Sequence, residues 1–198
     1  QSGEMAVVNR TRIAIAGLGM AVTPHARGFI DLADTVEVVH AFSPSAARRQ
    51  AFSERFPFPT CDSLETILAD DSVEAVAVFT PANTHRNIAI ACARAGKHVL
   101  MEKPLDITTA RAEALVAGCL AAGVKLGVVL QHRFRPAALR AAELIAQGRL
   151  GRIVGCSTTI RLWRPQSYYD EPGRGSFARD GGGVLISQGI HTLDLMLS

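Results

Sequence analysis

The sequence lacks the patterns typical of metal sites, disulfide scaffolds, membrane proteins and nucleic-acid-binding proteins. Its four cysteines (Cys61, Cys92, Cys119 and Cys156) include no CxxC pair, so we expect no metal site and no disulfide framework. No apolar run reaches the ~18 residues that a membrane span needs. The net charge is only +3 and the basic residues are scattered, which argues against nucleic acid as a partner. We expect reduced, buried thiols in a cytoplasmic protein without a membrane or nucleic-acid partner.

The length of the chain and its first residues limit how many domains it can hold and where the first one begins. Residues 1–11 are expected to be a leader or tag, because Gln1 to Glu4 lack the charged-then-apolar layout of a signal peptide. A chain of 198 residues, 48% of them hydrophobic, can bury one core and begin a second. We expect a first domain over residues 12–135, then a linker helix and the beginning of a second, incomplete domain over residues 136–198.

Short apolar segments alternate with helical ones through the first domain. Strands are expected at Arg12–Ala16, Val36–Phe42, Ala75–Phe79, His98–Met101 and Lys125–Leu130. Helices are expected at Ala21–Ala33, Ser45–Arg55, Leu64–Leu68, Thr84–Ala95 and Thr108–Ala122, the last two ending at Gly96 and Gly123. Continuous apolar strands between helices predict an α/β fold with a doubly wound parallel sheet.

The pattern changes after residue 135. A helix is expected over Pro136–Gln147, followed by a turn. Thr, Ile and Arg alternate over Gly155–Trp163, which predicts a strand with one solvent-exposed face. Tyr168–Asp180 is polar and rich in Gly and Pro, so we expect a loop there. A final helix is expected from Gly183 to the end of the chain.

A glycine-rich turn lies between the first strand and the first helix. Gly17, Gly19, Met20 and Ala21 form it, and Val22 holds the place of the third glycine of a GxGxxG pattern. Glycine permits a sharp bend and a close approach of backbone N–H groups to a pyrophosphate, while the helix N-terminus adds partial positive charge. At the head of a βαβ unit the pattern favours a dinucleotide site over a simple tight turn.

The end of the second strand bears on the choice between NAD and NADP. An NAD site usually has an acid there to bind the ribose 2′-OH, and this strand ends without one. Ser43, Ser45, Arg48 and Arg49 follow instead, and hydroxyls and arginines suit a 2′-phosphate. We therefore favour NADP over NAD. In the alternative interpretation, Arg48 and Arg49 form an ordinary solvated helix face.

Several further motifs, in order, resemble one enzyme family. The Glu102-Lys103-Pro104 segment resembles the signature of the glucose–fructose oxidoreductase and inositol dehydrogenase family, the Gfo/Idh/MocA family. The other matching pieces are His25 after the glycine turn, the segment Thr80 to His85, the segment Arg133 to Pro136, and Gly181 to Gly183 leading to His191 and Asp194. The resemblance covers nearly everything from Arg12 to Ser198.

The resemblance implies a Rossmann domain followed by an α/β substrate domain on a large open mixed sheet. It implies that Thr80, Pro81, Asn83 and His85 line the cofactor, with Glu102 and Lys103 near its nicotinamide end. It also implies that Lys103 reaches the reacting oxygen, and it allows a cis Lys103–Pro104 bond. Homo-oligomers through the second domain are an expectation of the same kind.

Hydride transfer from a secondary alcohol needs a base and a cation. His191 is the candidate base, and Lys103 can stabilise a developing alkoxide. Ser187 lies four residues before His191 on the expected helix, where many relatives carry an aspartate that would support the imidazole. Arg133 is expected either to contact the substrate or to pair with a nearby acid. Asp194 is expected either to brace its helix or to act on His191.

Three hypotheses follow. The first is an NAD(P)-dependent oxidoreductase acting on a secondary alcohol or carbonyl of a sugar, inositol or related polyhydroxylated compound. The second is a non-catalytic NAD(P)-binding regulator, motivated by Ser187 and by a chain that stops inside the helix of His191. The third, a purely structural role, leaves the glycine turn and the ordered motifs unexplained. Under this third hypothesis His191 would be a structural histidine and Lys103 a surface lysine at a strand end.

Overall fold

The computed structural model describes residues 10–198, and it confirms the α/β fold. Six parallel strands form one sheet in the order β3-β2-β1-β4-β5-β6, the doubly wound arrangement of a Rossmann domain. The chain enters at the centre of the sheet, because β1 pairs with both β2 and β4. The strands are β1 Thr11–Ala16, β2 Val36–Phe42, β3 Thr60–Cys61, β4 Ala75–Val78, β5 His98–Met101 and β6 Leu126–Val128.

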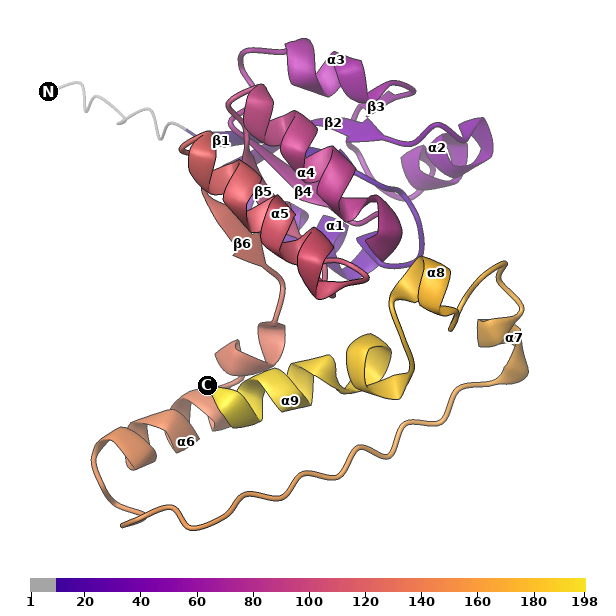
Figure 1. Ribbon diagram of the computed structural model, residues 1–198. Helices are drawn as coiled ribbons and strands as arrows, with labels where there is room; N and C mark the ends of the chain where they lie inside the picture. The colour runs from indigo at the N-terminus through magenta and orange to yellow at the C-terminus, as the bar shows by residue number, and fades with distance from the viewer. Residues whose placement is uncertain (1–9) are drawn as a thin grey trace, which may run out of the picture.

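Helices cover both faces of this sheet (Figure 1). Two of them, α1 and α2, pack with Ile13 and Ile15 on one face, while α3, α4 and α5 pack with Ala14 and Val76 on the other. Alternate residues of β1 therefore serve two separate cores. The helices of this domain are α1 Val22–Asp31, α2 Ala46–Ser53, α3 Leu64–Ala69, the 3-10 turn η1 Ala82–Thr84, α4 His85–Arg94 and α5 Thr109–Ala121.

Local capping explains where these helices begin and end. The hydroxyls of Ser45, Ser63 and Thr108 each accept a hydrogen bond from a backbone N–H in the first turn of α2, α3 and α5. Gly96 and Gly123 follow α4 and α5 with φ angles of 71° and 67°, as the sequence predicted. The observed strands and helices of this domain lie within three residues of their predicted ends. The two-residue strand β3 and the short 3-10 turn η1 were not predicted.

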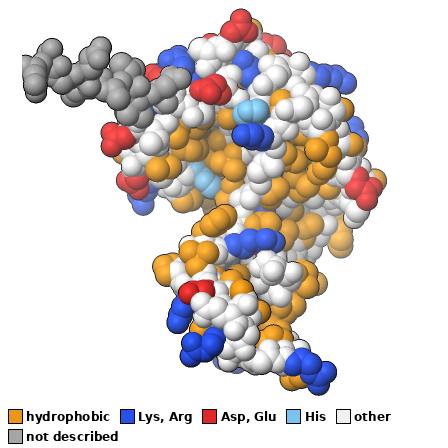
Figure 2. Space-filling model, turned by 90° about the vertical axis from the view of Figure 1, so that its left-hand side faces the viewer, with side chains coloured by type: hydrophobic (Ala, Val, Ile, Leu, Met, Phe, Trp, Pro, Cys, Tyr) orange, Lys and Arg blue, Asp and Glu red, His pale blue; other side chains and the backbone are white. Residues whose placement is uncertain are grey.

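The residues after β6 form a smaller lobe, which lies below the sheet in Figure 1. Figure 2 shows this lobe as a narrower part below the larger one. Hydrophobic side chains are exposed on the larger lobe down to the junction between the two lobes. Its elements are η2 Gln131–Phe134, α6 Pro136–Ala146, α7 Gln166–Tyr169, α8 Phe177–Asp180, the π-helical turn η3 Leu185–Gly189 and α9 Ile190–Leu197. No helix within the described residues is long and apolar enough to span a bilayer.

Three predictions for this lobe are corrected. The strand expected over Gly155–Trp163 is wrong, because the segment has no hydrogen-bonded neighbour strand among the described residues and takes no regular structure. The loop expected over Tyr168–Asp180 contains the end of α7 and all of α8, where Ser176 caps a helical turn. The last helix starts at Val184 and opens with the wider turn η3.

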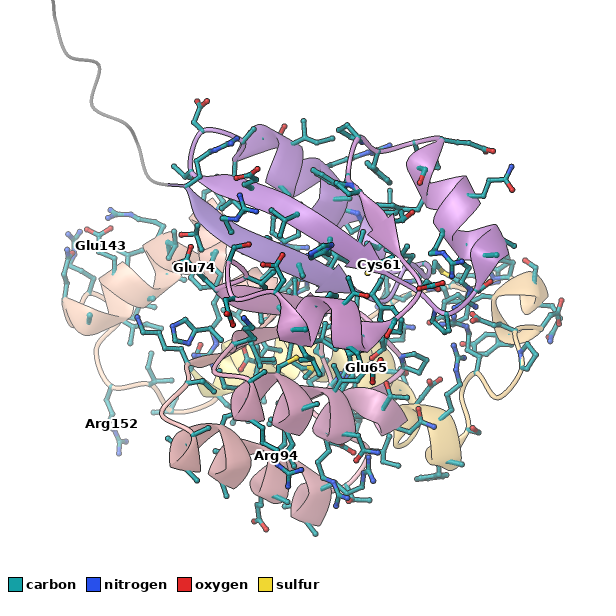
Figure 3. All side chains as sticks on the ribbon, turned by 90° about the horizontal axis from the view of Figure 1, so that it is seen from above. Cys61, Glu65, Glu74, Arg94, Glu143 and Arg152 are labelled. Atoms are coloured by element: carbon teal, nitrogen blue, oxygen red, sulfur yellow. The ribbon has the colours of Figure 1, made fainter. Side chains whose placement is uncertain are left out.

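The cysteines partly match their prediction. Cys92 and Cys119 are buried, and burial raises the pKa of the Cys92 thiol to about 12. Cys61, labelled in Figure 3, is half-buried, and Cys156 is exposed, which corrects the expectation of four buried thiols. All four are free. Most of the expected leader, residues 1–9, lies outside the described residues, and Thr11 belongs to β1.

Candidate functional site

The glycine turn joins β1 to α1 at the carboxyl edge of the sheet. Gly17 has a φ angle of 103°, and a Cβ atom there would lie 2.8 Å from the backbone of Phe79 and Thr80 at the end of β4. Gly19 is less constrained, because its Cβ would meet only the Arg48 guanidinium at 3.8 Å. No side chain caps the N-terminus of α1. The N–H groups of Gly17 and Val22 donate to the Phe42 and Gly19 carbonyls, so the N–H groups between them, with the open space at Gly19, are the ones that fit a pyrophosphate.

The residues after β2 stand beside this turn. Ser43 is buried and accepts a hydrogen bond from the Ser45 backbone N–H, while the Ser45 hydroxyl caps α2. Arg49 donates to the Ser43 carbonyl at 2.7 Å, so its guanidinium is occupied by the loop. Arg48 is exposed, and its guanidinium lies over Gly19. Of the two arginines, Arg48 has the position expected for a phosphate ligand.

The loop after β4 holds the residues that the resemblance assigned to the cofactor. Thr80, Pro81 and Asn83 stand at its surface or half-buried. His85 differs, since it is only 1% exposed and its two ring nitrogens lie 2.9 Å from the carbonyls of Thr80 and Pro104. It ties the loops after β4 and β5 together. The structure thus places His85 beneath the loop after β4, in a bracing position.

The loop after β5 carries Glu102 and Lys103. One carboxylate oxygen of Glu102 lies 3.1 Å from Nε2 of His25, and the other accepts the Lys103 backbone N–H at 2.6 Å. The His25 ring stacks on Phe79 with centroids 4.1 Å apart. The Lys103–Pro104 bond is cis. His25 links the first turns of α1 to the lysine loop, a role that its sequence spacing did not indicate.

Lys103 of the larger lobe and His191 of the smaller lobe line the same cavity. The Lys103 ammonium donates to the Ser187 carbonyl at 2.8 Å. Ser187 also lines this cavity, which has a volume of about 440 Å³. Burial and then the charge of Lys103 lower the pKa of His191, which favours the neutral imidazole that a base requires. His132 stacks on His191, with ring centroids 4.9 Å apart.

The structure shows the bonding partners of Ser187 and Arg133. The Ser187 hydroxyl donates back to the Gly183 carbonyl at 2.9 Å, and within the described residues no hydrogen bond joins it to His191. Arg133 binds Asp194 through two nitrogens, one of them at 2.6 Å. This ion pair braces η2 against α9, and the Arg133 hydrogen bond holds the pKa of Asp194 below its usual value. Arg133 thus pairs with an acid, and Asp194 braces its helix, as one of the two alternatives for each residue had it.

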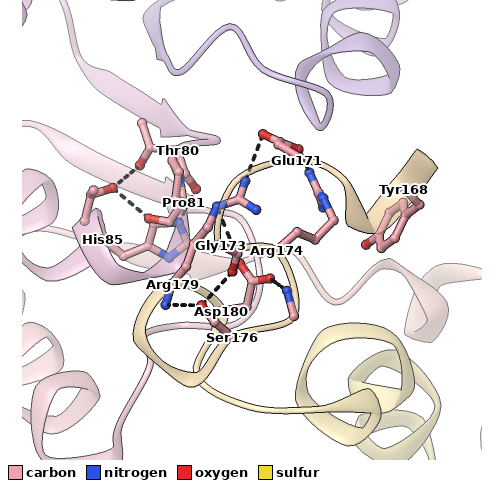
Figure 4. A network of polar contacts seen from close by, with 12 residues as sticks. Thr80, Pro81, His85, Tyr168, Glu171, Gly173, Arg174, Ser176, Arg179 and Asp180 are labelled. Carbon is pink, nitrogen blue, oxygen red and sulfur yellow. Dashed lines mark hydrogen bonds and ion pairs between the residues drawn. The ribbon is translucent and has the colours of Figure 1, made fainter. Parts of the chain in front are cut away.

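A charged network lies within the small lobe, where α8 packs near the loop after β4, and the sequence did not predict it. Figure 4 shows Glu171 with Arg174 and Arg179, and it draws Thr80 and Pro81 of the loop after β4 in the same view. Glu171 forms ion pairs with both arginines, and the Arg174 guanidinium lies 4.5 Å from the centre of the Tyr168 ring. The positive charge of Arg48 contributes to lowering the pKa of Glu171, after the larger effects of Arg174 and Arg179.

The strand order brings the predicted site residues to one edge. Ser43, Gly17, Thr80 and Glu102 follow β2, β1, β4 and β5, four neighbours in the sheet. Ligands of open α/β sheets bind outside the carboxyl ends of such strands. Among residues 10–198, no group of three His, Cys, Asp or Glu side chains is close enough to hold a metal ion.

Comparison with known proteins places the chain in a family. Residues 11–130 match the Gfo/Idh/MocA family model, described as an oxidoreductase family with an NAD-binding Rossmann fold. Residues 138–198 match the model of the Gfo/Idh/MocA C-terminal domain. The chain belongs to this family.

Similar proteins include enzymes that act on sugars and inositols. A 1,5-anhydro-D-fructose reductase from Ensifer adhaerens is 36% identical over 163 residues, which cover 81% of this chain and 48% of that protein. An NADP(+)-dependent scyllo-inositol 2-dehydrogenase from Bacillus subtilis is 27% identical over 194 residues, 96% of this chain and 52% of that one. The chain thus spans about half the length of these relatives.

A solved structure shows the same arrangement. The WlbA dehydrogenase from Bordetella pertussis, in complex with NADH and UDP-GlcNAcA, superposes with a TM-score of 0.83 at 32% identity. The match covers 94% of this chain and 54% of that one. The solved structure of this dehydrogenase therefore shares the fold of the present chain over both its larger and its smaller lobe.

Proposed function

We propose that this chain supplies the cofactor domain and the catalytic pair of an NADP-preferring oxidoreductase. The reaction is hydride transfer between nicotinamide and a secondary alcohol or carbonyl of a sugar, inositol or related polyhydroxylated compound. One observation carries the proposal: the Lys103 ammonium and the His191 imidazole line one cavity beside the carboxyl edge of a Rossmann sheet. The relatives are named as reductases and dehydrogenases, which gives no support to a non-catalytic regulator.

The roles of the two residues follow from their chemistry. In the oxidative direction His191 accepts the hydroxyl proton, and Lys103 stabilises the oxygen as negative charge develops. The nicotinamide supplies the hydride acceptor. Burial lowers the pKa of His191, so its neutral form persists to a lower pH than that of an ordinary histidine.

The cofactor would be held by the glycine turn and by Arg48. The uncapped first turn of α1 faces the pyrophosphate position, and the Arg48 guanidinium over Gly19 suits a 2′-phosphate. Arg49 is bonded to the Ser43 carbonyl and contributes to the loop's shape. This geometry supports the preference for NADP over NAD.

Binding tests the cofactor assignment. NADPH and NADH are titrated against the protein by quenching of Trp163, its one tryptophan, and by calorimetry. Arg48→Gln should weaken NADPH binding roughly 10- to 100-fold, the value of a lost charge-assisted hydrogen bond, and leave NADH binding unchanged. Equal loss for both cofactors would place Arg48 outside the 2′-phosphate site.

Turnover tests the catalytic assignment, with the full-length protein and a panel of sugars and polyols. Lys103→Met and His191→Asn should each lower kcat by roughly 100-fold or more while NADPH still binds. Arg140→Gln is the matched control, because Arg140 lies exposed on α6 and, among the residues that the structure describes, pairs only with Glu143. Unchanged turnover in both active-site variants would refute the proposed chemistry.

A further inference from the structure

The cavity between the lobes carries charge of one sign. Its lining includes the cations Lys103, Arg135, Arg161 and Arg164 together with His132 and His191, and no aspartate or glutamate of the described residues lines it. The remaining lining residues are polar or aliphatic: Thr159, Ile160, Leu162, Ser187, Gln188 and Thr192. Like charges around one space repel each other, so the cavity favours an anion.

The carboxylates nearest to the cavity are already hydrogen-bonded to other groups of the protein. Glu102 holds His25 and the Lys103 backbone N–H, and Asp194 holds Arg133 through two bonds. Both carboxylates are largely buried in these contacts, with 13% and 12% of their side chains exposed. They cannot turn to the cavity without breaking the bonds that hold the lysine loop and α9.

The cationic side chains differ in what they bind. The ammonium of Lys103 donates to the Ser187 carbonyl, and Arg164 donates to the Gln188 side chain at 3.1 Å. Across residues 10–198, neither Arg135 nor Arg161 makes a side-chain hydrogen bond or ion pair. These two guanidinium groups present unused donors to the cavity.

The positive charges of the cavity also lower the pKa values of its two histidines. Burial and then the charge of Arg135 lower the pKa of His132, and Lys103, His132 and Arg135 act together on His191 in the same direction after burial. Glu102 opposes this effect on His191 only in part. A positive potential thus extends through the cavity.

We propose that the cavity binds a hydroxylated substrate that carries an anionic group, a carboxylate or a phosphate, with Arg135 and Arg161 as its ligands. The proposal rests on the proposed function, since it takes this cavity as the substrate site. The anion is distinct from the cofactor's own phosphates. No residue of the glycine turn or of the segment from Ser43 to Arg48 lines the cavity, and those residues follow β1 and β2 rather than β5. A guanidinium pair suits both carboxylate and phosphate, because its planar donors match two oxygens at once.

Matched sugars test the anion preference on the full-length protein. The probes are D-glucuronate, D-glucose 6-phosphate and the neutral methyl α-D-glucoside, each titrated by calorimetry and by the fluorescence of Trp163, the neighbour of Arg164. We expect at least one anionic probe to bind roughly tenfold or more tightly than the neutral glucoside, with affinity that falls as salt rises. The two anionic probes separate a carboxylate site from a phosphate site.

Variants locate the effect. The double change Arg135→Gln and Arg161→Gln should remove the preference for the anionic probe and leave the neutral glucoside unaffected. Arg152→Gln is the control, because Arg152 belongs to the same lobe but points away from the molecule, as Figure 3 shows. Circular dichroism establishes that each variant is folded.

The outcomes separate this inference from the proposed function. Equal binding of anionic and neutral probes, binding of none of them by folded protein, or an unaltered preference in the double variant would each overturn the anionic site. If NADPH fails to bind while the anion preference holds, the oxidoreductase proposal fails and the anionic site stands. If NADPH binds and a neutral sugar turns over without any anion preference, the proposed function stands and this inference fails.

Discussion

Replacement of Gly17 by alanine should destabilise the Rossmann domain, whereas the same change at Gly19 should not. Gly17 combines a φ angle of 103° with a Cβ direction that ends 2.8 Å from two backbone atoms, the Phe79 carbonyl carbon and the Thr80 nitrogen. Backbone atoms cannot rotate away as a flexible side chain can. Gly19 has no positive φ angle, and its Cβ would make an ordinary contact with Arg48 at 3.8 Å.

The magnitude follows from two contributions. A positive φ angle costs an L-residue about 1–2 kcal/mol, and forcing a methyl group into a packed site costs about 1–3 kcal/mol. We expect Gly17→Ala to lower the free energy of unfolding by about 2–5 kcal/mol. A domain of this size loses roughly 2–4 °C of Tm for each kcal/mol, so the expected drop is roughly 4–20 °C.

Thermal and urea unfolding, followed by circular dichroism, measure this drop. Gly19→Ala is the matched control: its Tm should stay near that of the wild type while NADPH binding weakens, because the added methyl group narrows the approach to the backbone N–H groups. Equal stability of Gly17→Ala and the wild type would show that the turn and the end of β4 do not pack as described.

Three further predictions concern ionisable groups. Because the pKa of His191 is lowered, kcat/KM for alcohol oxidation should fall only below about pH 6.5. A His191→Asn variant should not show this fall in the pH profile. A fall that begins at a higher pH would contradict the assignment. Hydrogen bonds from Ser72 and His40 lower the pKa of Asp70 to about 2 from 3.8, so this carboxylate stabilises the fold above pH 3.8 and stops doing so as the pH falls toward 2. Asp70→Asn should therefore lower Tm at pH 7, with a difference from wild type that closes near pH 2; a constant difference would rule this out. His25→Phe keeps a ring against Phe79 but loses the bond to the Glu102 carboxylate, so kcat should fall roughly 10- to 100-fold while NADPH affinity holds, and a fall in both would indicate general damage.

The sheet could be predicted because its signals are local. Apolar runs such as Ala75–Val78 are buried on both faces, and glycines such as Gly96 end helices through their own backbone conformation. These features need only a few neighbouring residues to be recognised. The strand β3 was missed because two residues leave no periodic pattern.

Features that depend on distant partners could not be predicted. The Gly155–Trp163 segment alternates like a strand, but a strand also needs a hydrogen-bonded neighbour, which no local pattern reveals. The spacing of Ser187 and His191 suggested one helix face, and the wider turn η3 and a backbone acceptor for the Ser187 hydroxyl changed the outcome. The His25–Glu102 pair joins residues 77 positions apart, so spacing along the chain gives no sign of it.

The central place of β1 in the sheet also has a consequence for folding kinetics. At its start, the Arg12 backbone N–H donates to Glu74 beside β4, a partner 62 residues away. Closing a loop of that length costs about 4 kcal/mol of chain entropy before any contact repays it. The contact between Gly17 and Thr80 forms only once β1 and β4 have paired, so the packing of the glycine turn against the loop after β4 should appear late. A nascent chain that ends before β4 lacks the backbone against which Gly17 packs.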